Sequence, residues 1–208
     1  MAKEGIGPLL FNPFKRVNGW KALWLGLGAM VVASLIGWLG NTHFDGVLDV
    51  HTGAAASLWF HVAESLIDWL AMAIILLGGG VLATRRWGKA MDLAGAQALA
   101  RAPMILAVLP PLLPPFRRQA ERYAAGTLGN LPGIQGGPVD MVIFWAGTLV
   151  IVAAVVWMVA LMWKGFGLAY RAKGNWAVIS FIAAIVLAEA LSKFIIVKLA
   201  HSQSPLGL

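Results

Sequence analysis

The sequence predicts an all-α fold, a polytopic membrane helix bundle of five transmembrane helices that begins with a short N-terminal interfacial helix. Apolar residues make up 60% of the 208 residues and charged residues only 12%, which is too apolar for a soluble domain of this size. The apolar residues are gathered in long runs, and about 20 of them suffice to cross a bilayer core. Basic residues flank the runs, as is typical of membrane anchoring. We therefore expect a lipid bilayer around the chain and no nucleic acid as partner, despite the net charge of +7.

The predicted elements follow one another within a single membrane domain of residues 1–208. Before the first span, Asn12 is a candidate helix cap and Pro13 suits the first helical position. The predicted spans cover about residues 20–39, 58–83, 99–116, 141–163 and 176–197. The third holds five prolines between positions 102 and 116, which kink or break a helix. This segment is either a short span, extended by Leu93–Arg101, or a re-entrant hairpin.

Two arguments bear on the orientation, and they disagree. Basic residues are usually more frequent on the cytoplasmic side of a membrane protein. Five spans would place eleven of the sixteen Lys and Arg residues there, and a re-entrant third segment would place thirteen there, so this rule favours the re-entrant arrangement. The depth of the charged residues within the membrane favours five spans. In that arrangement Asp68 and Lys193 lie at similar distances from the outer surface and can pair. We expect the cytoplasmic membrane of a prokaryote, with the N-terminus in the cytoplasm and the C-terminus outside.

Ionisable residues inside the predicted spans form the candidate site. They are His61, Glu64, Asp68, Glu189 and Lys193. Such groups are costly in a membrane and are commonly functional. The first three lie on one helical face, where they can bind a divalent cation or relay protons. Alternatively, His61 and Glu64 lie in water at the outer interface, and only Asp68 is buried, paired with Lys193.

Two further patterns concern contacts within and between helices. Glu189 and Lys193 are four residues apart, in the order that favours an intrahelical ion pair. Small residues recur at every fourth position on two spans, where another helix can pack closely. They are Ala29, Ala33 and Gly37 on the first span, and Ser180, Ala184, Ala188 and Ser192 on the fifth.

Several chemistries find no support in the sequence. The chain has no cysteine, which excludes disulfides and zinc–thiolate sites. It contains no Ser–His–acid set, metalloprotease helix or nucleotide fingerprint, so we predict neither enzyme activity nor a cofactor. The residues His43, Asp45, Asp49 and His51 match no standard metal-ligand spacing, and we expect a solvated loop without metal.

Three segments resemble the YIP family of multispan membrane proteins. They are Asn12-Pro13-Phe14, then Ala98-Leu99-Ala100-Arg101-Ala102-Pro103-Met104-Ile105-Leu106, and the link Lys164-Gly165-Phe166-Gly167-Leu168. The resemblance covers roughly residues 10–198 and implies five helices with a cytoplasmic N-terminus. Eukaryotic members are adaptors that bind Rab GTPases and carry a long N-terminal region. This chain has only about 20 residues before the first span and is similar to the compact prokaryotic members, so Rab binding is not carried over.

These features predict a non-enzymatic membrane scaffold or adaptor of the YIP type, which associates with itself or with another membrane protein. The two small-residue faces motivate this hypothesis. A second hypothesis is a small cation- or proton-coupled permease that uses the intramembrane carboxylates. A third is an outward-facing pH or metal sensor built on His61 and the loop histidines.

Overall fold

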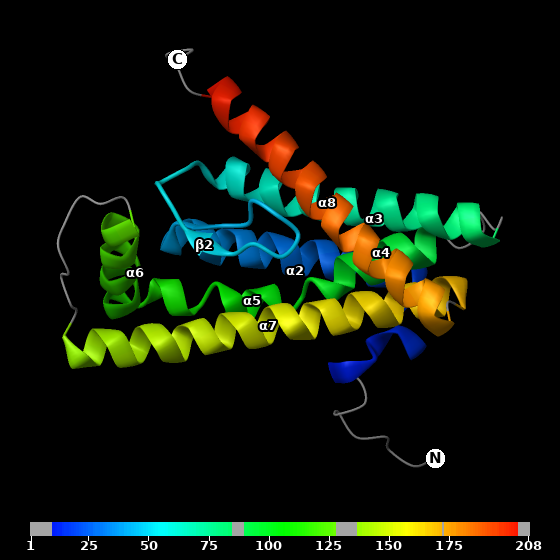
Figure 1. Cartoon of the computed structure of the whole chain (residues 1–208), viewed down its shortest axis with the longest axis horizontal. Coiled ribbons are helices and arrows are strands. Elements are labelled where there is room, and N and C mark those ends of the chain that lie inside the picture. Colours follow the sequence, from blue (N-terminus) through cyan, green and yellow to red (C-terminus); the bar gives the residue numbers. More distant parts are fainter. Residues whose placement is uncertain (1–9, 85–89, 128–136, 172, 204–208) are drawn as a thin grey trace.

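The computed structural model describes residues 10–84, 90–127, 137–171 and 173–203, and it is almost entirely helical (Figure 1). The elements are η1 (Pro13–Lys15), α2 (Gly19–Gly40), β1 (Thr42–His43), β2 (His51–Thr52), α3 (Leu58–Thr84), α4 (Ala90–Ala100), α5 (Met104–Ala107), η2 (Pro110–Leu112), α6 (Pro114–Thr127), α7 (Pro138–Tyr170) and α8 (Gly174–Gln203). Five segments are long and apolar enough to cross a membrane, which confirms the predicted multispan helix bundle.

Four predicted spans lie inside longer helices, whereas the bounds of the third were wrong. Residues 90–112, not 99–116, form the third apolar segment, as the succession α4, α5 and η2. The alanine-rich stretch from Ala90 is helical despite its polar residues, because alanine is the strongest helix former. Prolines divide the rest into short pieces, and Pro114 begins the separate helix α6. α7 also runs through the predicted link at 164–168 and ends only at Tyr170.

α2 and α4 pack with their backbones close together. A side chain at Gly26 would collide with the backbone of Ala98 and Leu99, and one at Gly95 would collide with the carbonyl of Gly19. Small residues at a helix contact permit this approach. On the predicted face of the first span, Ala33 and Gly37 are buried and Ala29 is half-buried.

α8 lies obliquely across α3, and its C-terminal end projects away from the bundle (Figure 1). Of the small residues predicted to form its packing face, Ala184, Ala188 and Ser192 are buried, while Ser180 is exposed. Both small-residue faces therefore contribute to packing within this chain.

The described part of the N-terminal segment begins at Leu10, and residues 1–9, where part of the predicted interfacial helix falls, lie outside the described residues. η1 is a single 3-10 turn with Pro13 at its start, and the side chain of Asn12 makes no capping hydrogen bond. Two side chains of α7 hold the segment: the indole N–H of Trp157 donates to the carbonyl of Leu10 at 3.0 Å, and Lys164 Nζ donates to the carbonyl of Phe11 at 2.7 Å.

The loop of residues 41–57, which we call the cap, folds onto the bundle along α2 (Figure 1). β1 pairs antiparallel with β2, so that His43 lies opposite His51. Phe44 and Val47 are each only 1% exposed and join the hydrophobic core. The expectation of a solvated loop was therefore wrong for His43, which is buried with these two side chains, whereas Asp45, Asp49 and His51 are half-buried to exposed.

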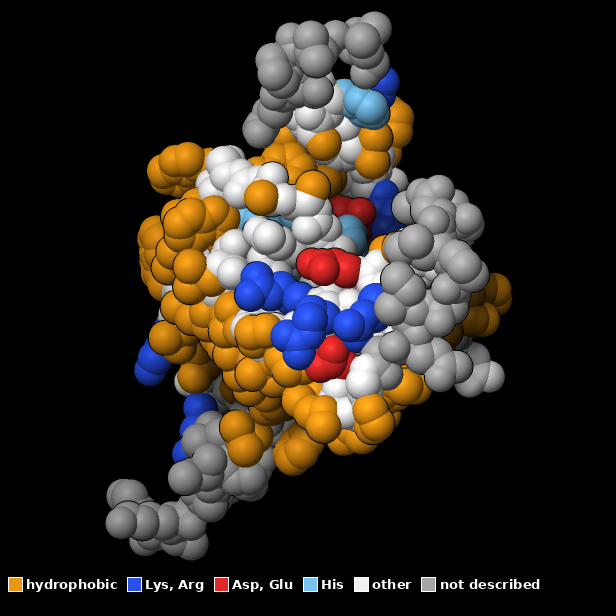
Figure 2. Space-filling model, turned by 90° about the vertical axis from the view of Figure 1, so that its left-hand side faces the viewer, with side chains coloured by type: hydrophobic (Ala, Val, Ile, Leu, Met, Phe, Trp, Pro, Cys, Tyr) orange, Lys and Arg blue, Asp and Glu red, His pale blue; other side chains and the backbone are white. Residues whose placement is uncertain are grey.

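α6 lies across the same end of the bundle and runs in a different direction from α7 (Figure 1). Basic side chains gather on this end next to acidic ones (Figure 2). The carboxylate of Asp140 accepts two hydrogen bonds from Arg118, at 2.7 and 3.1 Å, and one from Arg122 at 2.9 Å. Asp140 thus fixes α6 to the start of α7.

Candidate functional site

One face of α3 is polar and buried under the cap. His61 and Asp68 are 0% exposed, and Glu64 is 1% exposed. The alternative that placed His61 and Glu64 in water was therefore wrong. The sequence could not show this, because the burial is produced by a loop from another part of the chain.

The half of this face nearer the cap forms a cluster of two imidazoles and one carboxylate. His43 Nδ1 lies 2.9 Å from Glu64 Oε1, and His61 Nδ1 lies 3.4 Å from Glu64 Oε2. The two imidazole rings lie next to each other, with centroids 4.5 Å apart. His61 and Glu64 face the cluster together because they are three residues apart on one helix.

The cap positions His43 through contacts on both ring nitrogens. Nε2 lies 2.8 Å from the carbonyl oxygen of Ala54, in hydrogen-bonding range, and Nδ1 faces Glu64. Burial lowers the pKa of His43, but the hydrogen bonds to Glu64 and Ala54 and the negative charge of Glu64 outweigh burial, and the pKa is raised. The backbone N–H of Phe44 also donates to Glu64, at 3.4 Å. Glu64 thus holds the start of the cap against α3.

The deeper half of the face contains a buried ion pair that sequence reasoning missed. Arg101 Nη2 donates to Asp68 Oδ2 at 3.0 Å, and the two side chains are 2% and 0% exposed. The predicted pairing of Asp68 with Lys193 was wrong. Arg101 was expected on the cytoplasmic side, but the third apolar segment begins at Ala90, which places Arg101 near its middle.

Glu189 and Lys193 form the predicted intrahelical pair, with Lys193 Nζ 3.1 Å from Glu189 Oε1. Both also reach the cap. Lys193 pairs with Asp49 at 2.7 Å, and the backbone N–H of Leu48 donates to Glu189 Oε2 at 2.9 Å. Gly46 lies against the Glu189 carboxylate so closely that a side chain there would collide with it. α8 therefore binds the middle of the cap, as α3 binds its start.

Two groups among the described residues bring three metal-ligating side chains together, with ligand atoms within 4.8 Å of one another. The buried group is His43, His61 and Glu64. The other group, Asp45, Asp49 and His51, is half-buried to exposed, and its Asp49 already pairs with Lys193.

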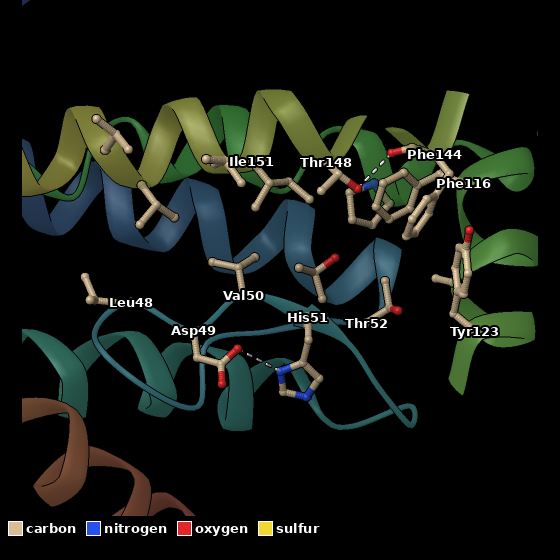
Figure 3. Close-up of a pocket in the computed structure, with 16 residues that line it drawn as sticks. Leu48, Asp49, Val50, His51, Thr52, Phe116, Tyr123, Phe144, Thr148 and Ile151 are labelled. Atoms are coloured by element: carbon tan, nitrogen blue, oxygen red, sulfur yellow. Dashed lines mark hydrogen bonds and ion pairs between the residues drawn. The ribbon is translucent and has the colours of Figure 1, made fainter. Parts of the chain in front are cut away.

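A groove of about 480 Å³ runs between the cap, α6 and α7. Figure 3 shows Leu48 and Val50 of the cap on one side and Ile151 of α7 on the other, with Phe116 and Tyr123 of α6 at one end. Apart from Asp49 and His51 at its edge, its lining carries no carboxylate, imidazole or basic group. The groove has the chemistry to accept an apolar group.

Comparison with protein-family models, with curated proteins and with solved structures gave no match.

Proposed function

We propose that the protein is a non-enzymatic membrane scaffold or adaptor of the YIP type, which presents the cap to a second copy or to another membrane protein. One observation carries the proposal. Charged side chains of the apolar helices α3 and α8 bind the cap. Glu64 of α3 contacts His43, and Glu189 and Lys193 of α8 contact Leu48 and Asp49, respectively. Glu64 is buried, whereas Glu189 and Lys193 are partly exposed, and together these charges hold a polar loop in a fixed shape.

The exposed part of the cap is the surface offered to a partner. Its residues His51, Gly53, Ala54, Ala55 and Ser57 are exposed. The small-residue faces, which first suggested association, are used in packing within the chain, so they support the proposal less than the cap does.

A photo-crosslinking residue placed at Ala55 is expected to form a discrete protein adduct in native membranes. The matched control is the same residue at Val186, which is 61% exposed on α8 and faces lipid in the proposed arrangement. Mass spectrometry of the adduct distinguishes a second copy from a different protein. Absence of any protein adduct at Ala55, or equal adducts at both positions, would contradict the adaptor role.

We propose the orientation that the family resemblance implies, with the N-terminus in the cytoplasm of a prokaryotic cell and the C-terminus outside. Ser202 is exposed near the end of α8, and the chain has no cysteine of its own. We expect a Ser202→Cys variant to react with an impermeant maleimide in intact cells or spheroplasts. Protection until lysis would reverse the proposed orientation of the C-terminus.

A permease that uses intramembrane carboxylates is the second candidate. Its specific support is that Asp68 Oδ1 and Arg101 Nη1 are buried without a hydrogen-bond partner among the described residues. Neither residue lines the groove between the cap, α6 and α7, the pocket beside the end of α8, or a third pocket between η1, α4 and the end of α7.

A further inference from the structure

The imidazole of His61 is buried with little hydrogen bonding, although the backbone of this residue is hydrogen-bonded. The residue is 0% exposed, and within the described part of the chain neither ring nitrogen has a hydrogen-bond partner in good geometry. Nδ1 lies 3.4 Å from Glu64 Oε2, longer than an ordinary hydrogen bond. Burying a polar group without a good hydrogen bond lowers the stability of the folded protein by about 1–3 kcal/mol, so the burial of this imidazole calls for an explanation.

His43 shows a related feature. When its Nε2–H donates to the Ala54 carbonyl, Nδ1 of the neutral ring carries a lone pair. That lone pair faces the Glu64 carboxylate at 2.9 Å. Two acceptors at this distance repel each other unless a cation lies between them, either a proton or a metal ion. A ring N–H donated to a backbone carbonyl is also the usual outer contact of a metal-bound histidine.

We propose that His43, His61 and Glu64 bind a divalent transition metal, with Zn²⁺ as the expected ion. Zn²⁺ lies about 2.0–2.2 Å from imidazole nitrogens and carboxylate oxygens, so neighbouring ligand atoms of a tetrahedral ion are roughly 3.3 Å apart. The separations of 2.9 and 3.4 Å run from the two Nδ1 atoms to different oxygens of the same carboxylate. One ligand atom from each of the three side chains lies within 4.8 Å of the others, close enough for one ion to bind all three. Two imidazoles and one carboxylate are ligands that Zn²⁺ accepts readily.

The surroundings of the cluster provide a route for the ion. A pocket of about 610 Å³ is lined by His43 and Glu64 together with residues of the cap and the end of α8. A metal ion can enter by this pocket, and a water molecule there can supply a fourth ligand. A bound ion would join the cap to α3 by coordination, since His43 belongs to the cap and the other two ligands to α3.

The first test is titration of the purified, chelator-treated protein with Co²⁺, which absorbs visible light when bound, followed by displacement with Zn²⁺. We expect one equivalent to bind and Zn²⁺ to displace it. His61→Gln and Glu64→Gln should each weaken binding by at least about tenfold, because each removes a ligand. The matched controls His51→Gln and His201→Gln alter exposed histidines and should bind as the wild type does.

Two results of this titration would overturn the proposal. One is the absence of saturable binding by the wild type. The other is binding that survives His61→Gln but is lost in His51→Gln, which would indicate adventitious binding at the exposed group of Asp45, Asp49 and His51.

A measurement on the unaltered protein covers the case in which the buried variants fail to fold. X-ray absorption at the zinc edge, on the wild type loaded with one equivalent, reports the ligands directly. We expect nitrogen and oxygen ligands with the scattering signature of two imidazoles. A first shell with one imidazole or none would overturn the site.

Discussion

Replacing Arg101 with leucine is expected to destabilise the protein by about 3–5 kcal/mol, because the carboxylate of Asp68 would remain buried without its counter-charge. Asp68→Asn should have an effect of similar size, since it leaves the guanidinium of Arg101 uncompensated. The reason is the depth of the pair, with both side chains almost completely inaccessible. Thermal unfolding in detergent micelles, followed by circular dichroism, would measure both effects.

The double variant Asp68→Asn/Arg101→Leu separates this ion pair from a general loss of packing. We expect it to be more stable than either single variant, because no unpaired charge remains. Lys193→Met is the matched control, since Lys193 is 42% exposed and its pair with Asp49 should contribute no more than about 1 kcal/mol. Additive losses in the double variant would show that the two side chains act independently.

The number and the approximate positions of the membrane helices could be predicted from the sequence, because a run of apolar residues of bilayer length has few alternative structures. The third segment was predicted less well. Its apolar core was recognised, and an extension through Leu93–Arg101 was one of the alternatives, but the predicted bounds of about 99–116 began too late and ended too late. The helix in fact continues back to Ala90, since alanine favours helix strongly enough to include polar residues.

The candidate site could be predicted only in part. The positions of His61, Glu64 and Asp68 on one helical face followed from helix geometry. Their partners, His43 and Arg101, did not, because these contacts join segments that lie 21 and 33 residues away in the chain. A signal was present in the apolar residues of the loop, such as Phe44 and Val47, which a fully solvated loop does not need.

Gly26→Ala and Gly28→Ala are expected to change the stability of the protein in opposite directions, although both residues lie within a single turn of α2. At Gly26 the added methyl group would meet the backbone of Ala98 and Leu99, which cannot rotate out of the way as a side chain can. Such overpacking costs about 1–3 kcal/mol or more. At Gly28 the methyl group would have no heavy atom within 4 Å and should stabilise the helix by about 0.5–1 kcal/mol.

This pair of variants tests how closely α2 and α4 approach, which sets the position of the polar face. α4 continues into Arg101, and α2 leads into the cap that carries His43, so a wider separation of the two helices would disturb both halves of the site. Melting temperatures of the two variants in the same detergent provide the measurement. Equal stability would show that the helices are not in backbone contact at Gly26, and the depth assigned to Arg101 would then need revision.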